Sequence, residues 1–303
     1  MLAFTHPACL AHDTGPGHPE SPARLEAVLQ AVRAAFPNAR WRDAPEASRD
    51  QLRRVHTRDL IARILDTPVE GLYRLDEDTV LSPGSAKAAL HAAGAAVAAV
   101  DAVLAGEDRL AFCAVRPPGH HAEAGRAMGF CLFNSVAVAA AHAVMEHGLR
   151  RVSIVDFDVH HGNGSQAIFQ DEPRVQYLSS HQWPLFPGTG LADERGMRNL
   201  GNALLAPGAG GEAFRTAWRE TLLPALEAFA PELLLVSAGF DGHRRDPLAD
   251  LVLEAEDYRW LSEQLAAAAQ RHAGGRVVSL LEGGYSLGAL RGSVVAHLQG
   301  LGA

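Results

Sequence analysis

The sequence has little lysine, little cysteine and no long uninterrupted apolar run. Lys87 is the only lysine among 27 basic residues, and 35 acidic residues give a formal net charge of −8. An acidic chain lacks the basic face that a general nucleic-acid binder needs. We therefore expect no nucleic-acid partner. The shortage of lysine does not point to any particular function.

The cysteines and the apolar residues exclude further classes. Cys9, Cys113 and Cys131 are odd in number and form no C-x-x-C pair, which argues against a disulfide scaffold and a four-cysteine zinc site. The most apolar stretch, Ala86–Leu104, is interrupted by charged residues and a histidine, so we expect no membrane span. No basic segment followed by an apolar run opens the sequence. We therefore expect a cytoplasmic protein with reduced thiols.

The sequence is rich in histidine, with 15 among 303 residues, and 48% of its residues are apolar. Histidine is the common metal ligand and acid/base group near neutral pH. No repeat, low-complexity tract or long linker interrupts the chain, so we expect one domain over residues 1–303. No feature of the sequence predicts an oligomeric state.

Short apolar runs alternate with helical patterns. The predicted strands are Ala111–Val115, Val152–Asp156, Val175–Leu178, Leu233–Ser237 and Val277–Leu281, and the predicted helices are Pro22–Ala35, Gly84–Ala105, Asn134–His147, Gly211–Phe229, Ala255–His272 and Leu287–Leu298. Continuous apolar strands are typical of a parallel sheet that is covered on both faces. We therefore predict an α/β fold with three layers, α/β/α, and expect Ser21 to cap the first helix.

Each predicted strand runs into a polar or glycine-rich loop, and parallel strands bring such loops to one edge. In Asp156-x-Asp158-x-His160 the alternate residues face the same side, and Asp241 follows another strand. Carboxylates and an imidazole without a thiolate suit zinc or a similar divalent ion. Three protein ligands leave a position open for water, as in catalytic sites. The alternative for the DxDxHH motif is a solvated turn.

Two further elements point to proton chemistry near that metal. His120 and His121 follow two prolines and a glycine, which present them on a rigid turn, and Asp156 and Asn163 are available to orient them. Tyr285 follows a pair of glycines, and its phenol can donate a hydrogen bond to a carbonyl oxygen that gains negative charge. The alternative for each of these residues is simple packing.

Together these motifs resemble the zinc-dependent histone deacetylase family. The matching segments are HPESPARL at 18–25, VHTRDL at 55–60, RPPGHHA at 116–122, GFCLFNSVAVAA at 129–140, DFDVHHGNGSQ at 156–166, FPGTG at 186–190, SAGFDGHRRDPL at 237–248 and LEGGY at 281–285. Asn163 in the GNG segment is similar to the class II branch and to bacterial histone deacetylase-like amidohydrolases. The resemblance implies the arginase/deacetylase-like version of the predicted fold, as a single deacetylase-like catalytic domain.

The resemblance also implies roles for the site residues. Asp158, His160 and Asp241 would bind one Zn²⁺ per chain, His121 would be the general base, Tyr285 would polarise the substrate carbonyl, and His120 and His121 would pair with Asp156 and Asn163 respectively. Gly129, Phe130, Phe186, Leu248 and Asp78 would form the substrate tunnel and its rim, and Asp156 and Ser179 would hold a structural K⁺. Arg24 would line an inner channel. Either His120 or His121 could protonate the leaving amine.

The implied reaction is removal of an acetyl or other acyl group from the ε-amine of lysine in a protein or peptide. The first alternative is a deacetylase of acetylated polyamines or another small N-acyl amine. The relatives that act on polyamines carry an acidic residue at the rim, where Leu248 stands here, whereas the net charge of −8 favours cationic substrates. A binuclear manganese ureohydrolase and a non-catalytic acyl-lysine binding module are less favoured, because carboxylates for a second metal are missing and the catalytic set is complete.

Overall fold

Eight parallel strands form the centre of the molecule. The structure is a computed structural model that describes residues 1–303, and its main sheet has the order β2-β1-β5-β10-β9-β6-β7-β8. The strands are β1 (Leu2–Thr5), β2 (Arg40–Asp43), β5 (Leu110–Cys113), β6 (Val152–Asp156), β7 (Val175–Gln182), β8 (Leu200–Leu205), β9 (Leu233–Ala238) and β10 (Val277–Leu281). A separate antiparallel pair comprises β3 (Tyr73–Arg74) and β4 (Val80–Leu81).

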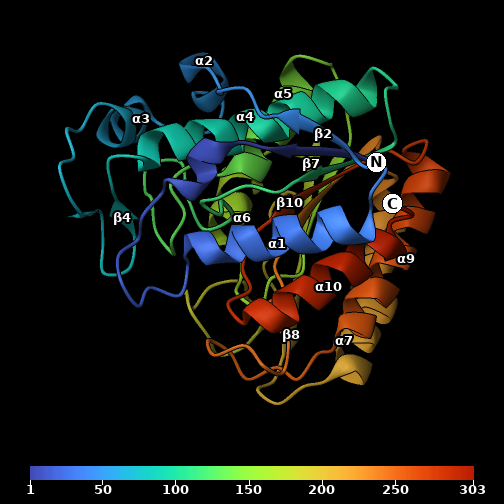
Figure 1. The fold of residues 1–303 in the computed structure, drawn as a ribbon. Helices are drawn as coiled ribbons and strands as arrows, with labels where there is room; N and C mark the ends of the chain where they lie inside the picture. The colour runs from blue at the N-terminus through green and yellow to red at the C-terminus, as the bar shows by residue number, and fades with distance from the viewer.

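Burial explains why the apolar runs form strands. Every residue of β5, β6, β7, β9 and β10 is buried, as expected for strands that helices cover on both faces. By contrast, β2 lies at one edge of the sheet and is largely exposed. The three-layer α/β/α prediction is confirmed (Figure 1).

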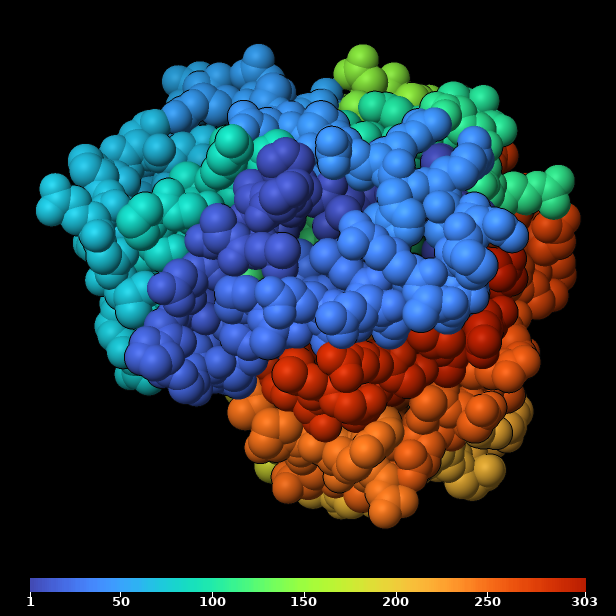
Figure 2. Space-filling model, in the orientation of Figure 1, coloured from blue at the N-terminus to red at the C-terminus, as the bar shows by residue number.

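Helices form the two outer layers. They are α1 (Pro22–Ala35), α2 (Arg49–Leu52), α3 (Arg58–Leu65), α4 (Ser85–Leu104), α5 (Ser135–Met145), α6 (Asn163–Phe169), α7 (Gly211–Ala217), α8 (Leu223–Phe229), α9 (Ala255–His272) and α10 (Leu287–Gly300), with a 3₁₀ turn η1 (Pro7–Leu10) and a π-helical turn η2 (Trp218–Leu222). α4 and α5 pack together on one face, and α1, α10 and α9 pack together on the other (Figure 1). Figure 2 shows the blue surface of α1 lying against the red surface of α10.

One helix combines length with an apolar composition. α4 is long and apolar enough to cross a membrane, but 72% of its apolar window is buried inside the structure. It contacts α5, β5, β1 and β10. α4 therefore packs as a core helix in this fold.

One local prediction was wrong and another is refined. The helix predicted over 211–229 has the predicted bounds, but it contains the π-helical turn η2 just before Pro224, a residue that cannot donate the hydrogen bond that a regular ladder requires there. Ser21 occupies the position before α1, but its side chain makes no capping hydrogen bond. Pro22 alone marks the beginning of that helix in the sequence.

The strand order places the candidate catalytic residues at the centre of the sheet. β5, β10, β9 and β6 are adjacent, and because they are parallel their carboxyl ends share one edge. The loops that follow them carry His120 and His121, Tyr285, Asp241, and Asp158 with His160, respectively. Residues separated by more than 160 positions in the chain therefore meet in one place.

Candidate active site

Asp158, His160 and Asp241 converge at the ends of β6 and β9. Their potential ligand atoms all lie within 4.8 Å of one another. His160 Nδ1 is 3.1 Å from Asp158 Oδ1 and 3.2 Å from Asp241 Oδ2. All three residues are buried, so the cluster is shielded from bulk water. The structure thus brings together the three residues that the sequence suggested as metal ligands.

Backbone groups orient the two carboxylates of this cluster. The Gly283 amide donates to Asp158 Oδ2 at 2.9 Å, and the Val159 amide donates to Asp241 Oδ1 at 2.9 Å. A Cβ at position 283 would lie 2.1 Å from Asp241 Oδ2, so glycine is required for this approach.

The second carboxylate oxygen of Asp241, Oδ2, indicates whether these three residues fit a metal ion. Oδ2 is buried and accepts no hydrogen bond. An unsatisfied buried carboxylate oxygen is costly, and a divalent cation would satisfy it. Two carboxylates and one imidazole match the nitrogen and oxygen donors that zinc takes in catalytic sites. The residues therefore fit a zinc ion held by Asp158, His160 and Asp241.

His120 and His121 lie beside the cluster, and each has an oriented ring. His120 Nδ1 is 3.0 Å from Asp156 Oδ2, and His121 Nδ1 is 2.8 Å from Asn163 Oδ1. The Asn163 amide nitrogen donates to Glu123 at 2.8 Å, which fixes the amide with its oxygen toward His121. His121 therefore donates through Nδ1 and keeps the lone pair of Nε2 free.

The two histidines differ in charge. Burial lowers the pKa of His120, but the carboxylates of Asp158 and Asp156 outweigh it and raise that pKa well above the usual value. Burial lowers the pKa of His121 well below the usual value, and the adjacent His120 and His160 lower it further. The site thus combines a cationic imidazole with a neutral one, which is the form that can accept a proton.

Glu282 has a place in the site that the sequence did not predict. Its Oε2 accepts hydrogen bonds from the backbone amides of Gly119 at 2.7 Å and His120 at 3.2 Å. The carboxylate after β10 thus fixes the turn that presents both histidines. The only signal in the sequence is its place in the Glu-Gly-Gly-Tyr segment, and its partner lies 163 residues away.

Tyr285 faces the same space from the end of β10. The Arg24 guanidinium lies 4.8 Å from the centre of its ring, and the Phe130 ring packs edge-on at 5.8 Å. Burial raises the pKa of Tyr285 well above its usual value, although the Arg24 charge opposes this. The phenol is therefore protonated at neutral pH and can donate a hydrogen bond.

Arg24 is itself fixed by the loop that carries Tyr285. It donates to the carbonyls of Gly284 at 2.6 Å and Glu282 at 2.5 Å, and pairs with Glu20 at 3.0 Å. The structure therefore places this buried arginine behind Tyr285, on the inner side of the site.

A narrow cavity of about 220 Å³ leads to these groups. Its lining comprises Asp78, His121, Gly129, Phe130, His160, Leu185, Phe186, Leu248 and Tyr285. All five predicted tunnel residues lie on this lining. Leu185, which the sequence did not single out, directly precedes Phe186. Gly129 has a backbone φ of +56°, and a Cβ at this position would lie 2.5 Å from the His121 ring, which explains why glycine stands there.

The loop that carries Phe186 is fixed by two histidines without a predicted role. His161 Nδ1 is 2.7 Å from the Thr189 hydroxyl, and His181 Nε2 is 3.0 Å from the carbonyl of Gly190. Both histidines are buried. They support one wall of the narrow cavity and do not face its reactive end.

A wider, acidic cavity of about 550 Å³ adjoins the narrow one. It is lined by Asp76, Glu77, Asp78, Arg126, Met128 and Phe186. Asp78 and Phe186 belong to both cavities, so the acidic surface lies at the mouth of the tunnel. Asp76 is 3.8 Å from Arg126, which leaves Glu77 and Asp78 without an arginine partner.

Asp156 and Ser179 are direct neighbours on β6 and β7. Asp156 Oδ2 receives hydrogen bonds from His120 and the Tyr177 hydroxyl, both at 3.0 Å, and Ser179 Oγ is 2.9 Å from His181 Nδ1. Buried carboxylate and hydroxyl oxygens such as these are the ligands that hard cations prefer. The structure thus brings together the two residues predicted for K⁺.

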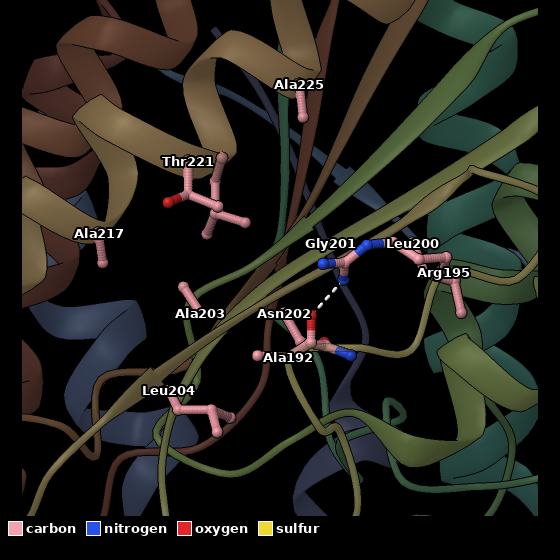
Figure 3. Close-up of a pocket in the computed structure, with 11 residues that line it drawn as sticks. Ala192, Arg195, Leu200, Gly201, Asn202, Ala203, Leu204, Ala217, Thr221 and Ala225 are labelled. Carbon is pink, nitrogen blue, oxygen red and sulfur yellow. Dashed lines mark hydrogen bonds between the residues drawn. The ribbon is translucent and has the colours of Figure 1, made fainter.

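The largest cavity lies elsewhere and carries no catalytic groups. It has about 640 Å³, lies along the edge strand β8 and η2, and is lined mainly by small and aliphatic side chains (Figure 3). Arg195 is its only charged residue and donates to the carbonyl of Ala192. Its lining offers no acid, base or nucleophile for hydrolysis, so size does not identify the active site.

Comparison with known proteins decides the family. A model of the histone deacetylase domain matches residues 18–301. This chain belongs to the histone deacetylase family. The histone deacetylase-like amidohydrolase of Pseudomonas aeruginosa is 40% identical over 93% of this chain and 81% of the relative. The probable deacetylase of Archaeoglobus fulgidus is 37% identical over 93% and 80%.

Two further members of the histone deacetylase family extend the comparison. The human polyamine deacetylase HDAC10 is 40% identical over 93% of this chain, which spans 44% of that longer protein. The crystal structure of the HDA15 HD domain has a TM-score of 0.94 and 33% identity over 99% of this chain and 89% of the matched one. The resemblance that the motifs suggested is confirmed at the level of family and fold.

Proposed function

We propose that this protein is a zinc-dependent amidohydrolase that removes acetyl or other acyl groups from lysine side chains of proteins or peptides. One observation carries this proposal: the Asp158–His160–Asp241 cluster, the oriented histidine pair and the Tyr285 ring surround the inner end of one narrow cavity. A narrow cavity with aromatic walls suits a long, unbranched chain that ends in an amide. Family membership supports the reaction class.

Zinc held by Asp158, His160 and Asp241 would supply Lewis acidity that activates water and polarises the amide carbonyl. The protein supplies the proton transfers. His121, oriented by Asn163, accepts a proton from the attacking water at its free Nε2. Asp156 holds the charged His120 beside His121, and the centres of these two histidine rings are 4.0 Å apart.

Tyr285 stabilises the charge that develops on the carbonyl oxygen. Its phenol donates a hydrogen bond to the oxyanion as the carbonyl carbon becomes tetrahedral. When the carbon–nitrogen bond breaks, the amine takes a proton from His121 or His120. Phe130 and Phe186 line the cavity and keep bulk water away from the reacting amide.

A specific observation keeps acetylated polyamines as a second candidate. The acidic cavity with Asp76, Glu77 and Asp78 opens beside the tunnel and would attract a free cationic amine. The relative named polyamine deacetylase adds support. Leu248 favours peptides, because an apolar rim offers no partner to a second ammonium group.

A substrate panel tests the proposal. The zinc-loaded enzyme is assayed with acetyl-lysine peptides, longer acyl-lysine peptides, acetylputrescine and acetylspermidine, and amine release is measured with and without a hydroxamate inhibitor. We expect the highest kcat/KM for an acyl-lysine peptide. A higher value for an acetylpolyamine would establish the second candidate, and no hydrolysis of any amide would refute the proposal.

Metal counting tests the remaining alternatives. The nearby carboxylates that a second manganese would need are engaged elsewhere, since Asp156 binds His120 and Tyr177 while Glu282 binds the Gly119 turn. We therefore propose one zinc per chain and a structural K⁺ near Asp156 and Ser179. Two equivalents of Mn²⁺ together with urea-forming activity would instead indicate a ureohydrolase.

A further inference from the structure

A buried carboxylate outside the predicted catalytic set joins two walls of the tunnel. Asp246 lies in the loop after β9, eight residues after the end of that strand, and is 8% exposed. Its Oδ2 accepts a hydrogen bond from the backbone amide of Tyr285 at 2.7 Å, and its Oδ1 accepts one from the amide of Leu248 at 3.1 Å. Both of these residues line the narrow cavity.

Arg24 holds the carbonyls of Glu282 and Gly284 in this loop, but the backbone amide of Tyr285 is held by Asp246. Tyr285 follows two glycines, and Gly284 has a φ of +119°, a conformation open mainly to glycine. The same Oδ2 also accepts a longer hydrogen bond from the amide of Ser286 at 3.3 Å, at the position before α10. No other hydrogen bond holds the backbone amide of Tyr285. Asp246 therefore fixes the backbone of Tyr285, while Arg24 and Phe130 contact its ring.

The position of Asp246 is itself well defined. Its amide donates to the carbonyl of His243 at 2.7 Å, and the amide of Arg245 donates to His243 Nδ1 at 3.1 Å. The loop after β9 thus forms a tight turn over residues 243–246, shortly after the metal-ligand candidate Asp241. A displacement of this turn would reach both Tyr285 and Leu248.

We propose that Asp246 is a positioning residue for catalysis, which holds the Tyr285 phenol at the distance from the substrate carbonyl that the reaction requires and fixes the Leu248 rim to the same frame. It does not touch the reacting atoms and acts only through Tyr285 and Leu248. The inference rests on the proposed amide hydrolysis. It predicts that loss of Asp246 affects turnover through Tyr285 and leaves the metal cluster intact.

A double-mutant cycle tests this role. Asp246→Asn keeps the size of the side chain but cannot accept from both amides, and it is measured alone and together with Tyr285→Phe. We expect Asp246→Asn to lower kcat about 10- to 100-fold, since misplacement of a catalytic group by about 1 Å has effects of that size. In the Tyr285→Phe background the same change should lower kcat less than about 2-fold, because the hydroxyl that it positions is gone.

The controls separate positioning from general damage. Zinc content should equal that of the wild type in every variant of the cycle. Asp257→Asn is the matched control, because Asp257 is also a buried aspartate that accepts a backbone hydrogen bond, from Glu254 at 2.9 Å, but it caps α9 and does not line the tunnel. We expect it to leave kcat unchanged. Should Asp246→Asn fail to fold, Asp246→Glu, which moves the carboxylate by one methylene group, enters the same cycle.

The outcomes of the cycle distinguish a failure of the positioning role from a failure of the proposed function. An equal loss of kcat in both backgrounds, a loss of zinc in Asp246→Asn, or near wild-type kcat in that variant would overturn the positioning role. A wild-type enzyme that hydrolyses no amide would instead refute the proposed function, before the cycle begins.

Discussion

Two clusters in this molecule combine carboxylates with imidazoles, and only one has the surroundings of a metal site. The inner cluster, Asp158, His160 and Asp241, lies at the centre of the sheet edge. The outer cluster comprises Asp101 on α4, His142 on α5 and His147 just after α5. In both clusters the potential ligand atoms lie within 4.8 Å of one another. The inner cluster has two carboxylates and one imidazole and the outer cluster the reverse, and both sets could hold zinc, so residue type and proximity alone do not decide between them.

Hydrogen bonding does distinguish them. In the outer cluster, His142 Nε2 and His147 Nε2 each lie 2.7 Å from the same Asp101 oxygen, and the Asp101 side chain is 52% exposed. Arg54 donates to His142 Nδ1, so the proton of that ring is on Nε2, toward Asp101. In the inner cluster Asp241 Oδ2 is buried and makes no hydrogen bond of acceptable geometry, although His160 Nδ1 lies 3.2 Å away. An unsatisfied buried acceptor, and not a set of residue types, therefore distinguishes the candidate metal site.

The largest expected effect comes from the inner cluster. Asp241→Ala removes the unsatisfied oxygen, so we expect metal content near zero and a loss of kcat of about three orders of magnitude or more, because a catalytic metal contributes several kcal/mol. Metal analysis of the purified protein and amide hydrolysis are measured together. Asp101→Asn in the outer cluster is the control and should retain one zinc and full activity. Retention of zinc by Asp241→Ala would contradict the assignment.

A second prediction separates metal binding from catalysis within the inner region. Tyr285→Phe removes one hydroxyl and leaves the three candidate ligands unchanged. We expect one zinc per chain and a kcat lowered about 10²- to 10³-fold, the usual effect of removing one donor to an oxyanion. Steady-state kinetics and metal analysis check both parts. Near-native turnover would show that this phenol does not stabilise the transition state.

A third prediction extends the comparison to three buried histidines that belong to neither cluster. Burial lowers the pKa of His12 and His56 to about 4 and of His297 to about 3. From pH 6.5 down to about 4 the unfolded chain binds protons at these positions that the folded chain does not bind, so stability is lost as the pH falls through that range. Each group should lower the free energy of unfolding by about 1–2 kcal/mol between pH 7 and pH 5.

Urea unfolding at pH 7 and pH 5 measures this dependence. His297→Gln provides the matched comparison, because His297 is held between Ser262 and Ser279 and contacts no candidate metal ligand. The variant should lose less stability than the wild type between the two pH values, whatever its stability at pH 7. If the variant and the wild type lost the same amount of unfolding free energy between pH 7 and pH 5, His297 would not contribute to the pH dependence of stability.

The smallest expected effect belongs to the outer cluster. His147→Ala removes a partly exposed hydrogen bond to Asp101, so we expect a loss of no more than about 1 kcal/mol in the free energy of unfolding and no change in kcat. The number of zinc ions bound at saturation should be one in both proteins. A decrease from two to one would show that the outer cluster binds metal and would remove the distinction between the two regions.

The strands that the sequence predicted share a simple physical property. β6 and β10 have the predicted bounds because buried apolar runs end there at loops with charged residues. β2 was missed because Arg40–Asp43 is an exposed, polar edge strand, and β8 because its Gly201-Asn202 pair resembles a turn. β1, a four-residue strand at the start of the chain, was also missed.

The sequence could likewise predict only some of the residues of the candidate site. Asp158, His160 and Asp241 could be proposed because strand ends of a parallel sheet meet at one edge. Glu282 and Asp246 could not, because their hydrogen bonds join backbone amides 163 and 39 residues away. Such contacts depend on how loops fold against one another, which neither periodicity nor residue type encodes.

The order of strands also governs when the site can form during folding. β10, the last strand of the chain, lies between β5 and β9 in the middle of the sheet. Until it is inserted, those two strands present unpaired edges, and the loop with Gly283 and Tyr285 is absent from the site. Assembly of the catalytic centre is therefore a late and global event, and a nascent chain that lacks β10 exposes two central strand edges prone to aggregation.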